Sequence, residues 1–336
     1  MFNNDWFKDK IITKKDRKIF YKILSFLLLI PLRIGVSPKW WKKNNEQTKI
    51  LVRRSVEKIS SHEYAFIPAG FAFYLFTSFI PVLILSISLI NIHYKDDDTK
   101  KFIFEEIISR YIPAIDKIFD FNKNESEVKN YNLILSFNKI NIILLISSLW
   151  ISSTGYAKFI TSQSIIYGHK NQGNWFINRM KGLIIVTVIS IFFAYLLLSA
   201  TFIFKKLDVQ IENKSIYIFL FYLISSFYII FFFFIVWFFL LKYTPTFKTS
   251  FKNIKPGVII SSLASTLFST IFGYLSSIKI IDYNKFGIFA TFLYLSTFTL
   301  FISYILYFGI IINEAFYKSF VSDKTKNKYR FQNKKI

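Results

Sequence analysis

The segment FAFYLFTSFIPVL, residues 71–83, contains no charged residue. It lies inside the apolar stretch 66–92, and about 20 apolar residues are enough for a helix to cross a membrane. Pro81 lacks an N–H group and its ring crowds the carbonyl of Thr77, so we expect a bend in this helix. In lipid, the hydroxyls of Thr77 and Ser78 can bond the preceding turn or a neighbouring helix beside that bend. The segment therefore predicts a bent membrane-spanning helix.

The same apolar character recurs along the chain. Of the 336 residues, 53% are hydrophobic and 20% aromatic, which is more apolar surface than one water-soluble core of this size takes up. The stretches lack the alternation of a membrane barrel strand. The sequence predicts an all-α, polytopic membrane helix bundle with six transmembrane helices in a membrane domain over residues 63–316. The predicted spans lie near residues 66–92, 140–160, 182–204, 215–241, 256–278 and 286–313.

The N-terminal region, residues 1–62, is basic and is predicted to be cytoplasmic. Its apolar piece, residues 23–32, is too short to span and is not followed by the cleavage site of a signal peptide. We expect an N-terminal interfacial amphipathic helix near residues 19–34, with its lysines toward anionic lipid headgroups. A buried helix that caps the bundle is the alternative. At the other end, residues 317–336 form a basic tail that is also predicted to be cytoplasmic.

The positive charge falls on one side of the predicted spans. The chain has 43 Lys and Arg residues, and 30 of them lie on the side that carries both chain termini, counting Lys158 there. Of the 20 acidic residues, 8 lie on that side. The remaining charged residues lie on the other side. The net charges are therefore +22 and +1. Because short cytoplasmic loops are enriched in Lys and Arg, both termini are predicted to be cytoplasmic. Topology thus accounts for the overall +23, and no nucleic-acid partner is expected.

The long segment 93–139 is predicted to be an external loop. It is acidic, and the run Asp96–Asp98 suggests a calcium-binding loop as one interpretation. A calcium loop of the EF-hand type needs a glycine at its bend, and this segment contains no glycine. A solvated acidic loop with a short helix near residues 103–112 is the favoured interpretation.

No catalytic, cofactor or metal site is predicted. The chain has no cysteine, and its three histidines, His62, His93 and His169, fall in different predicted loops, which are not all on one side of the membrane. The sequence motifs of hydrolases, metalloproteases and phosphate-binding loops are absent. Charged residues occur only at the ends of the predicted spans, and three of these are expected to be interfacial anchors: Glu63, Lys285 and Glu314.

Hydroxyl groups and glycines supply the polarity inside the spans. In the fifth span, Ser261, Ser265, Ser269 and Gly273 recur every four residues. Such small residues let two helices approach closely, and the same row of hydroxyls could equally line a substrate path. The candidate path or packing residues are Tyr74, Thr77, Ser78, Pro81, Ser148, Trp150, Ser152, Ser153, Ser261, Ser265, Ser269, Gly273, Gly287, Gly309 and Asn313.

Three groups of residues stand out for their order and spacing. They are Phe71-Ala72-Phe73-Tyr74 with Ser78 and Pro81; Leu149-Trp150 and Ser152-Ser153 with Tyr167-Gly168; and Pro256-Gly257, Tyr274, Tyr283-Asn284, Phe286-Gly287, Gly309 and Asn313. Together they resemble the signature of the YihY/BrkB family. The resemblance covers about residues 50–316. It implies a six-helix protein of the bacterial cytoplasmic membrane, sometimes linked to virulence, whose older label as a tRNA-processing ribonuclease is regarded as a misassignment.

The chain departs from this pattern at three places. Thr154 stands where the family usually has arginine, Ile311 where it has an acidic residue, and Phe286 where it has tyrosine. We expect a transport or flux protein for a small neutral, zwitterionic or amphiphilic solute. The alternatives are an envelope-organising or virulence-associated membrane protein that transports nothing and, more remotely, a membrane-bound ribonuclease.

Overall fold

The structure is a computed structural model. It describes residues 45–93, 99, 102–112, 139–211, 213–277 and 288–328, together with Lys22, Ile23 and Phe26. Gly287, most of the predicted interfacial helix near 19–34 and most of the predicted external loop lie outside the described residues. The predictions for those segments therefore stay predictions.

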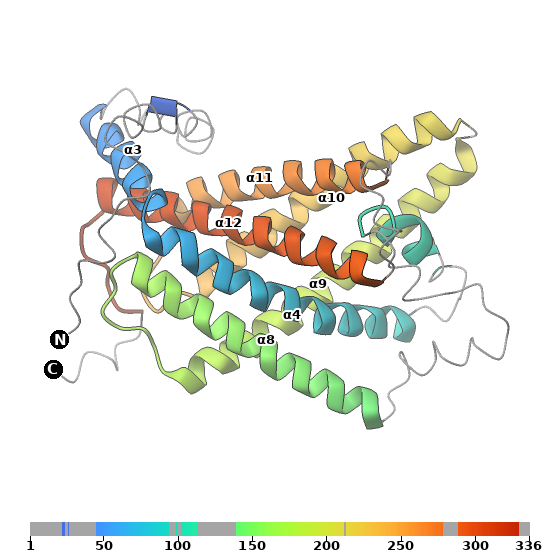
Figure 1. The fold of residues 1–336 in the computed structure, drawn as a ribbon, viewed down its shortest axis with the longest axis horizontal. Helices are drawn as coiled ribbons and strands as arrows, with labels where there is room; N and C mark the ends of the chain where they lie inside the picture. Colours follow the sequence, from blue (N-terminus) through green and yellow to red (C-terminus); the bar gives the residue numbers. More distant parts are fainter. Residues whose placement is uncertain are drawn as a thin grey trace.

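The part of the chain that the structure describes is all-α. Figure 1 shows long helices that run side by side, with α3 at one end of the bundle. We call this the α3 end. The elements are α3 (Asn45–Ile59), α4 (His62–His93), the π-helix η2 (Ile103–Ile108), α8 (Lys139–Ile166), α9 (Trp175–Gln210), α10 (Lys214–Tyr243), α11 (Phe251–Ser277) and α12 (Ile288–Phe320).

Each of the six predicted spans coincides with a long helix. Five of these, α4, α9, α10, α11 and α12, are long and apolar enough to cross a membrane. The chain therefore has the character of a multi-pass membrane protein. The predicted span 140–160 falls on α8, which packs in the bundle against α4 and α9. Because α8 is not among the five, its crossing of the membrane stays a prediction.

The helices pack in a definite order. α4 contacts α8, α9 and α12, while α11 lies against α10 and α12. Aromatic rings tie the centre together, since the ring of Phe71 on α4 stacks on Phe159 of α8 at 4.8 Å and meets Tyr307 of α12 edge-on at 5.7 Å. α3 lies across the end of α12 and buries Leu51, Val52 and Val56 there.

The segment quoted first forms part of α4, which is one continuous helix through Pro81. The hydroxyls of Thr77 and Ser78 donate to the carbonyl oxygen of Tyr74, at 3.1 and 2.6 Å. They thus bond the preceding turn, which is one of the two alternatives that the sequence left open. The bend at Pro81 stays a prediction.

The turn between α8 and α9 fixes where α9 begins. Gly168 and Gly173 have φ angles of 63° and 85°, in the left-handed region that glycine adopts without a steric penalty. Asn174 then caps α9, because its side-chain oxygen accepts a hydrogen bond from the N–H of Phe176. The turn therefore places Trp175 and Arg179, in the first turns of α9, beside α8.

Three predicted cytoplasmic segments meet at one end of the bundle. The N–H of Lys248 donates to the carbonyl of Lys326 at 2.8 Å, and the hydroxyl of Thr246 donates to the carbonyl of Asn171 at 2.8 Å. We expect reporter fusions at Lys170, Lys248 and Lys326 to give cytoplasmic signals, and fusions at Asn124, Glu212 and Asp282 to give external ones. A cytoplasmic signal at Asn124 would overturn the predicted orientation.

Candidate functional site

A buried ion cluster joins α3 to α12. The side chain of Glu314 is 0% exposed, and Arg54 donates to it from Nη2 at 2.8 Å and from Nε at 3.2 Å. Lys58 lies one turn further along α3, and its Nζ is 3.3 Å from the same carboxylate. The hydrogen bonds with Glu314 raise the pKa of the Arg54 guanidinium above its ordinary value. One buried carboxylate therefore holds two cations of α3.

The expectation that Glu314 is an interfacial anchor is wrong. Its carboxylate is fully buried because α3 covers it and supplies its partners. From the sequence, residues 45–59 are only part of a basic region, and Arg54 and Lys58 are not among the predicted functional candidates. Their four-residue spacing beside the apolar Leu51, Val52 and Val56 is the signal of an amphipathic helix that could have found them.

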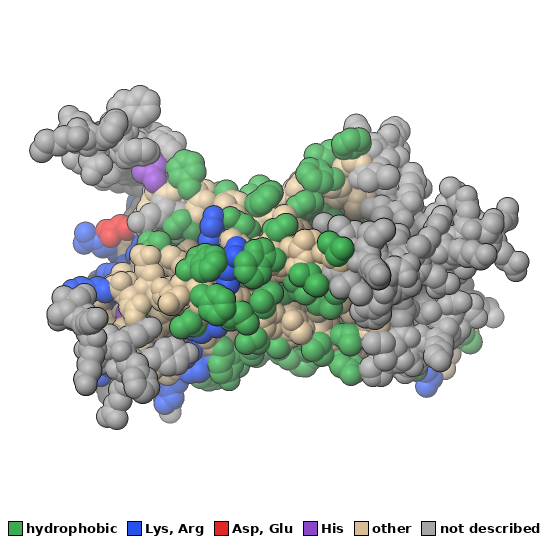
Figure 2. Space-filling view, turned by 90° about the horizontal axis from the view of Figure 1, so that it is seen from below, with side chains coloured by type: hydrophobic (Ala, Val, Ile, Leu, Met, Phe, Trp, Pro, Cys, Tyr) green, Lys and Arg blue, Asp and Glu red, His purple; other side chains and the backbone are tan. Residues whose placement is uncertain are grey.

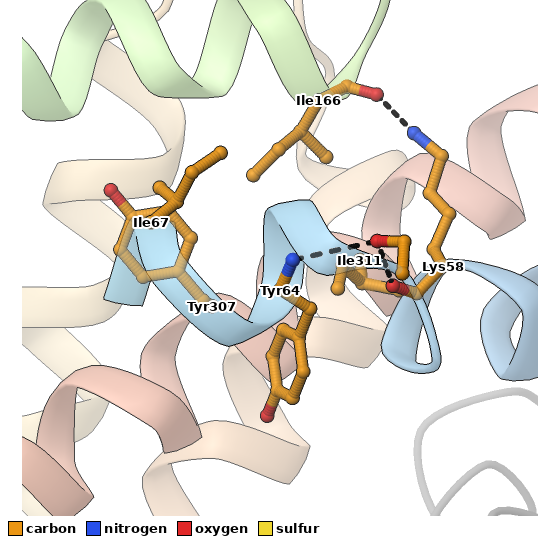
Figure 3. Close-up of a pocket in the computed structure, with 7 residues that line it drawn as sticks. Lys58, Tyr64, Ile67, Ile166, Tyr307 and Ile311 are labelled. Atoms are coloured by element: carbon orange, nitrogen blue, oxygen red, sulfur yellow. Dashed lines mark hydrogen bonds between the residues drawn. The ribbon is translucent and has the colours of Figure 1, made fainter. Parts of the chain in front are cut away.

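A small pocket, which we call the α3 pocket, lies beside the ion cluster. Figure 3 shows Lys58 on one side of it, with its ammonium donating to the carbonyl of Ile166, and Ile67 and Tyr307 on another. The pocket joins a positive group to a mainly apolar wall, and its free volume of about 10 Å³ is no more than one water molecule needs. Its lining residues are Lys58, Ser61, Tyr64, Ile67, Ile166, Tyr307 and Ile311.

The serine row of α11 faces the interior of the bundle. Ser261 donates to the carbonyl of Gly257 at 2.5 Å, and Ser265 accepts a hydrogen bond from the indole N–H of Trp237 on α10 at 3.2 Å. Ser269 is 4% exposed, and its hydroxyl has no hydrogen-bond partner within the described residues. The four-residue spacing thus marks a buried face of α11.

Among the described glycines, Gly257 has the closest contact, where α11 crosses α12. A Cβ atom on Gly257 would lie 2.1 Å from the carbonyl oxygen of Gly309, and one on Gly309 would lie 2.8 Å from that of Gly257. Asn313 spans the same crossing, because its side-chain oxygen accepts from the N–H of Gly257 at 2.7 Å. Gly273, further along α11, packs against the ring of Tyr111. Two of the candidate residues, Gly309 and Asn313, therefore meet Gly257 at one backbone crossing.

The candidates on α8 lie apart from that crossing. Ser148, Ser152 and Ser153 each donate to a carbonyl of the preceding turn of α8, at 2.7–2.9 Å. The hydroxyl of Tyr74 on α4 accepts from Lys158 of α8 at 2.6 Å. The structure thus divides the sequence-predicted candidates between an α4/α8 group and an α11/α12 group.

Comparison with known proteins identifies the chain. The family model described as Virulence factor BrkB matches residues 55–333, from the middle of α3 to beyond α12. The chain belongs to this family. The resemblance found in the sequence is confirmed over residues 55–333. No curated protein and no solved structure matches the chain.

The chain's departures from the usual BrkB pattern can now be placed. Thr154 accepts a hydrogen bond from Arg179 of α9, so a guanidinium is present beside the position where the family usually has its own arginine. Ile311 is buried in the wall of the α3 pocket, and Glu314 supplies a buried carboxylate one turn later. In this BrkB protein a positive group therefore lies beside Thr154, and a negative group lies about one helical turn from Ile311.

No group of three or more His, Cys, Asp or Glu residues that could hold a metal occurs in the described ranges. His169 is buried, its Nδ1 lies 2.7 Å from the hydroxyl of Thr325, and burial lowers its pKa. The expectation that this BrkB protein has no catalytic residue, metal or cofactor stays a prediction.

Proposed function

We propose that this BrkB protein is a transport or flux protein for a small neutral, zwitterionic or amphiphilic solute. It would act in the bacterial cytoplasmic membrane with both termini inside and with lipids as its partners. The observation that carries the proposal is the α3 pocket, a cavity of about 10 Å³ where α3, α4, α8 and α12 meet, which would have to widen to admit a solute.

The side chains that line the α3 pocket limit the charge that a solute can carry. Its one cation, Lys58, already pairs with Glu314 and donates to the carbonyl of Ile166. The hydroxyl of Tyr307 is bonded to that of Ser162, and the hydroxyl of Ser61 donates to the carbonyl of Lys58, so a ligand would meet a mainly apolar wall. This combination favours a solute without net charge, because a charged solute would require a further buried counter-charge.

The ion cluster around Glu314 holds α3 against α12 and so keeps the α3 pocket closed. Lys58 belongs both to the pocket and to the cluster around Glu314, so movement of α3 away from α12 would widen the pocket and break the cluster together. Buried ion pairs contribute little net stability, and one attested use of such pairs is to select between two packings. The cluster is accordingly the candidate gate.

Flux measured in liposomes tests this function. Purified protein should increase the flux of at least one solute in a panel of neutral, zwitterionic and amphiphilic compounds above that of empty liposomes. Ile67→Trp enlarges the wall of the α3 pocket and so obstructs its widening, and in protein that stays folded it should reduce this flux about tenfold. Phe66→Trp is the matched control, because Phe66 is 69% exposed and points away from the core. Equal flux in both variants would contradict a path through the pocket.

A second candidate is an envelope-organising membrane protein that transports nothing. It is favoured by the buried hydroxyls of α8 and α11, many of which bond their own helix and leave the bundle closely packed. The absence of flux for every solute in a protein that remains folded would support this candidate. We expect no ribonuclease activity in protein freed of contaminating nucleases.

A further inference from the structure

Two cations lie on the outer surface of the bundle among hydrophobic side chains. Figure 2 shows the face on which α8 and the start of α9 lie in Figure 1, with Lys and Arg side chains between hydrophobic ones. Trp150, Thr154 and Lys158 recur every four residues on α8 and so share one face of the helix. Trp150 is 48% exposed, and Lys158 is exposed as well. A positive group therefore stands on an outward-facing row of α8.

The second cation, Arg179, comes from α9 and is held in a fixed position. Its guanidinium lies 4.3 Å from the ring centre of Trp150 and 4.6 Å from that of Trp175. Its Nη2 donates to the hydroxyl of Thr154. Contacts with two indole rings stabilise the cation and orient its plane. Arg179 is thus oriented before any ligand arrives.

Close helix packing supports this arrangement. A Cβ atom on Gly182 of α9 would lie 2.6 Å from the carbonyl oxygen of Ser153 on α8, so the two helices cross with almost no space between them. Gly182 follows Arg179 by three residues, and Ser153 precedes Thr154. The crossing therefore fixes the distance between Arg179 and the outward-facing row of α8.

Lys158 directs its charge to the same area. Its Nζ donates to the hydroxyl of Tyr74 at 2.6 Å and lies 4.9 Å from the centre of that ring. Lys158 is one helical turn from Thr154, the residue that Arg179 contacts, and Cβ atoms one turn apart are separated by about 6 Å. The points at which the two cations contact α8 are therefore about one helical turn apart.

The positive charge at this patch is not neutralised by the described part of the chain. No described carboxylate forms an ion pair with Arg179 or Lys158, and the hydrogen bond of the Arg179 guanidinium goes to the neutral hydroxyl of Thr154. Arginine carries five donors in a planar fork that matches phosphate oxygens. The arrangement is therefore complementary to an anion with several oxygens.

The position along α9 indicates where that anion comes from. Residues 182–204 contain no charge and at about 1.5 Å per residue are long enough to cross a hydrocarbon core of roughly 30 Å. Arg179 precedes this stretch by three residues and so lies at the border of the core. Trp and Tyr concentrate at this depth, where lipid phosphates are the abundant anions.

We propose that Arg179 and Lys158 form a binding site for the phosphate of an anionic phospholipid headgroup, bordered by Trp150, Trp175 and Tyr74. Free phosphate offers the same oxygens, but the hydrophobic surface around the site suits a ligand with acyl chains. The site is separate from the α3 pocket and does not require the protein to be a transporter.

Binding of phosphatidylglycerol to the full-length protein in detergent micelles, followed by native mass spectrometry, tests the site. Arg179→Gln should weaken binding at least tenfold, and Lys158→Gln should weaken it at least threefold. Arg53→Gln is the matched control, because it removes the same charge from an exposed pair with Glu57 on α3, and binding should change less than twofold. Arg179→Lys keeps the charge without the fork and should give an intermediate affinity.

Competition separates the two sources of phosphate. Inorganic phosphate at millimolar concentration should leave lipid binding unchanged. If free phosphate displaces the lipid, the site binds a soluble anion and the proposal of a lipid site is wrong. Equal losses in Lys158→Gln and Arg53→Gln would reduce the effect to general surface charge and overturn the site. Size-exclusion chromatography would reveal whether Arg179→Gln folds. If it does not, the comparison of Lys158→Gln with Arg53→Gln still tests the site, because Lys158 is exposed and its replacement should not disturb folding.

Discussion

Replacing Gly257 with alanine is expected to prevent α11 and α12 from packing correctly. The new Cβ atom would lie 2.1 Å from the carbonyl oxygen of Gly309 and 2.5 Å from the side chain of Asn313. Overpacking of a core typically costs about 1–3 kcal/mol, and we expect more than ~3 kcal/mol here because the blocking atom belongs to the backbone. The variant should aggregate on size-exclusion chromatography or melt well below the wild type in detergent.

Two other glycines provide graded comparisons. A Cβ atom on Gly309 would lie 2.8 Å from its nearest neighbours, one of which is the movable hydroxyl of Ser261, so Gly309→Ala should have a smaller effect. A Cβ atom on Gly70 would meet no neighbouring atom within 4 Å, and alanine is favoured over glycine in a helix by about 1 kcal/mol. Gly70→Ala should therefore melt at or above the wild-type temperature. Similar melting of the Gly257 and Gly70 variants would contradict this account of the crossing.

Patterns confined to one helix could be predicted from the sequence. The apolar stretches located all six long helices, and the four-residue spacing of Ser261, Ser265 and Ser269 marked a face that is buried in the bundle. The hydroxyls of Thr77 and Ser78 also bond within their own helix, so their partner was accessible to local reasoning. Periodicity and turn-to-turn bonding depend only on neighbouring residues.

Contacts between distant segments could not be predicted in the same way. Glu314 lies 260 residues from Arg54, and nothing near Glu314 in the sequence indicates that α3 covers it. Arg179 meets Thr154 only because α9 crosses α8 at Gly182. The sequence therefore predicted the elements, whereas the ion cluster and the cation patch depend on how the helices cross.

Glu314→Gln is expected to destabilise the α3 end by about 3 kcal/mol. Removing one partner of a buried ion pair typically costs about 3–5 kcal/mol, and we expect the lower end because the side chains of Arg54 and Lys58 are 38% and 25% exposed and can turn toward water. An unfolding titration in mixed micelles would measure the loss. Arg53→Gln removes an exposed pair with Glu57, and loss of that pair should cost about 0.3–0.5 kcal/mol. Equal stability of Glu314→Gln and the wild type would rule out the cluster as a structural contact.

A triple variant separates a structural role of the cluster from a gating role. Replacing Arg54 and Lys58 with methionine and Glu314 with leucine removes all three charges and should recover most of the stability, because apolar residues can replace buried ions without loss. If the cluster only holds α3 on α12, the triple variant should keep wild-type flux in liposomes. If the cluster is the gate, the variant should be as stable as the wild type and yet show altered flux, because α3 would no longer be released by breaking ion pairs. If stability and flux change in the same proportion, gating is excluded and the cluster serves only to hold α3 on α12.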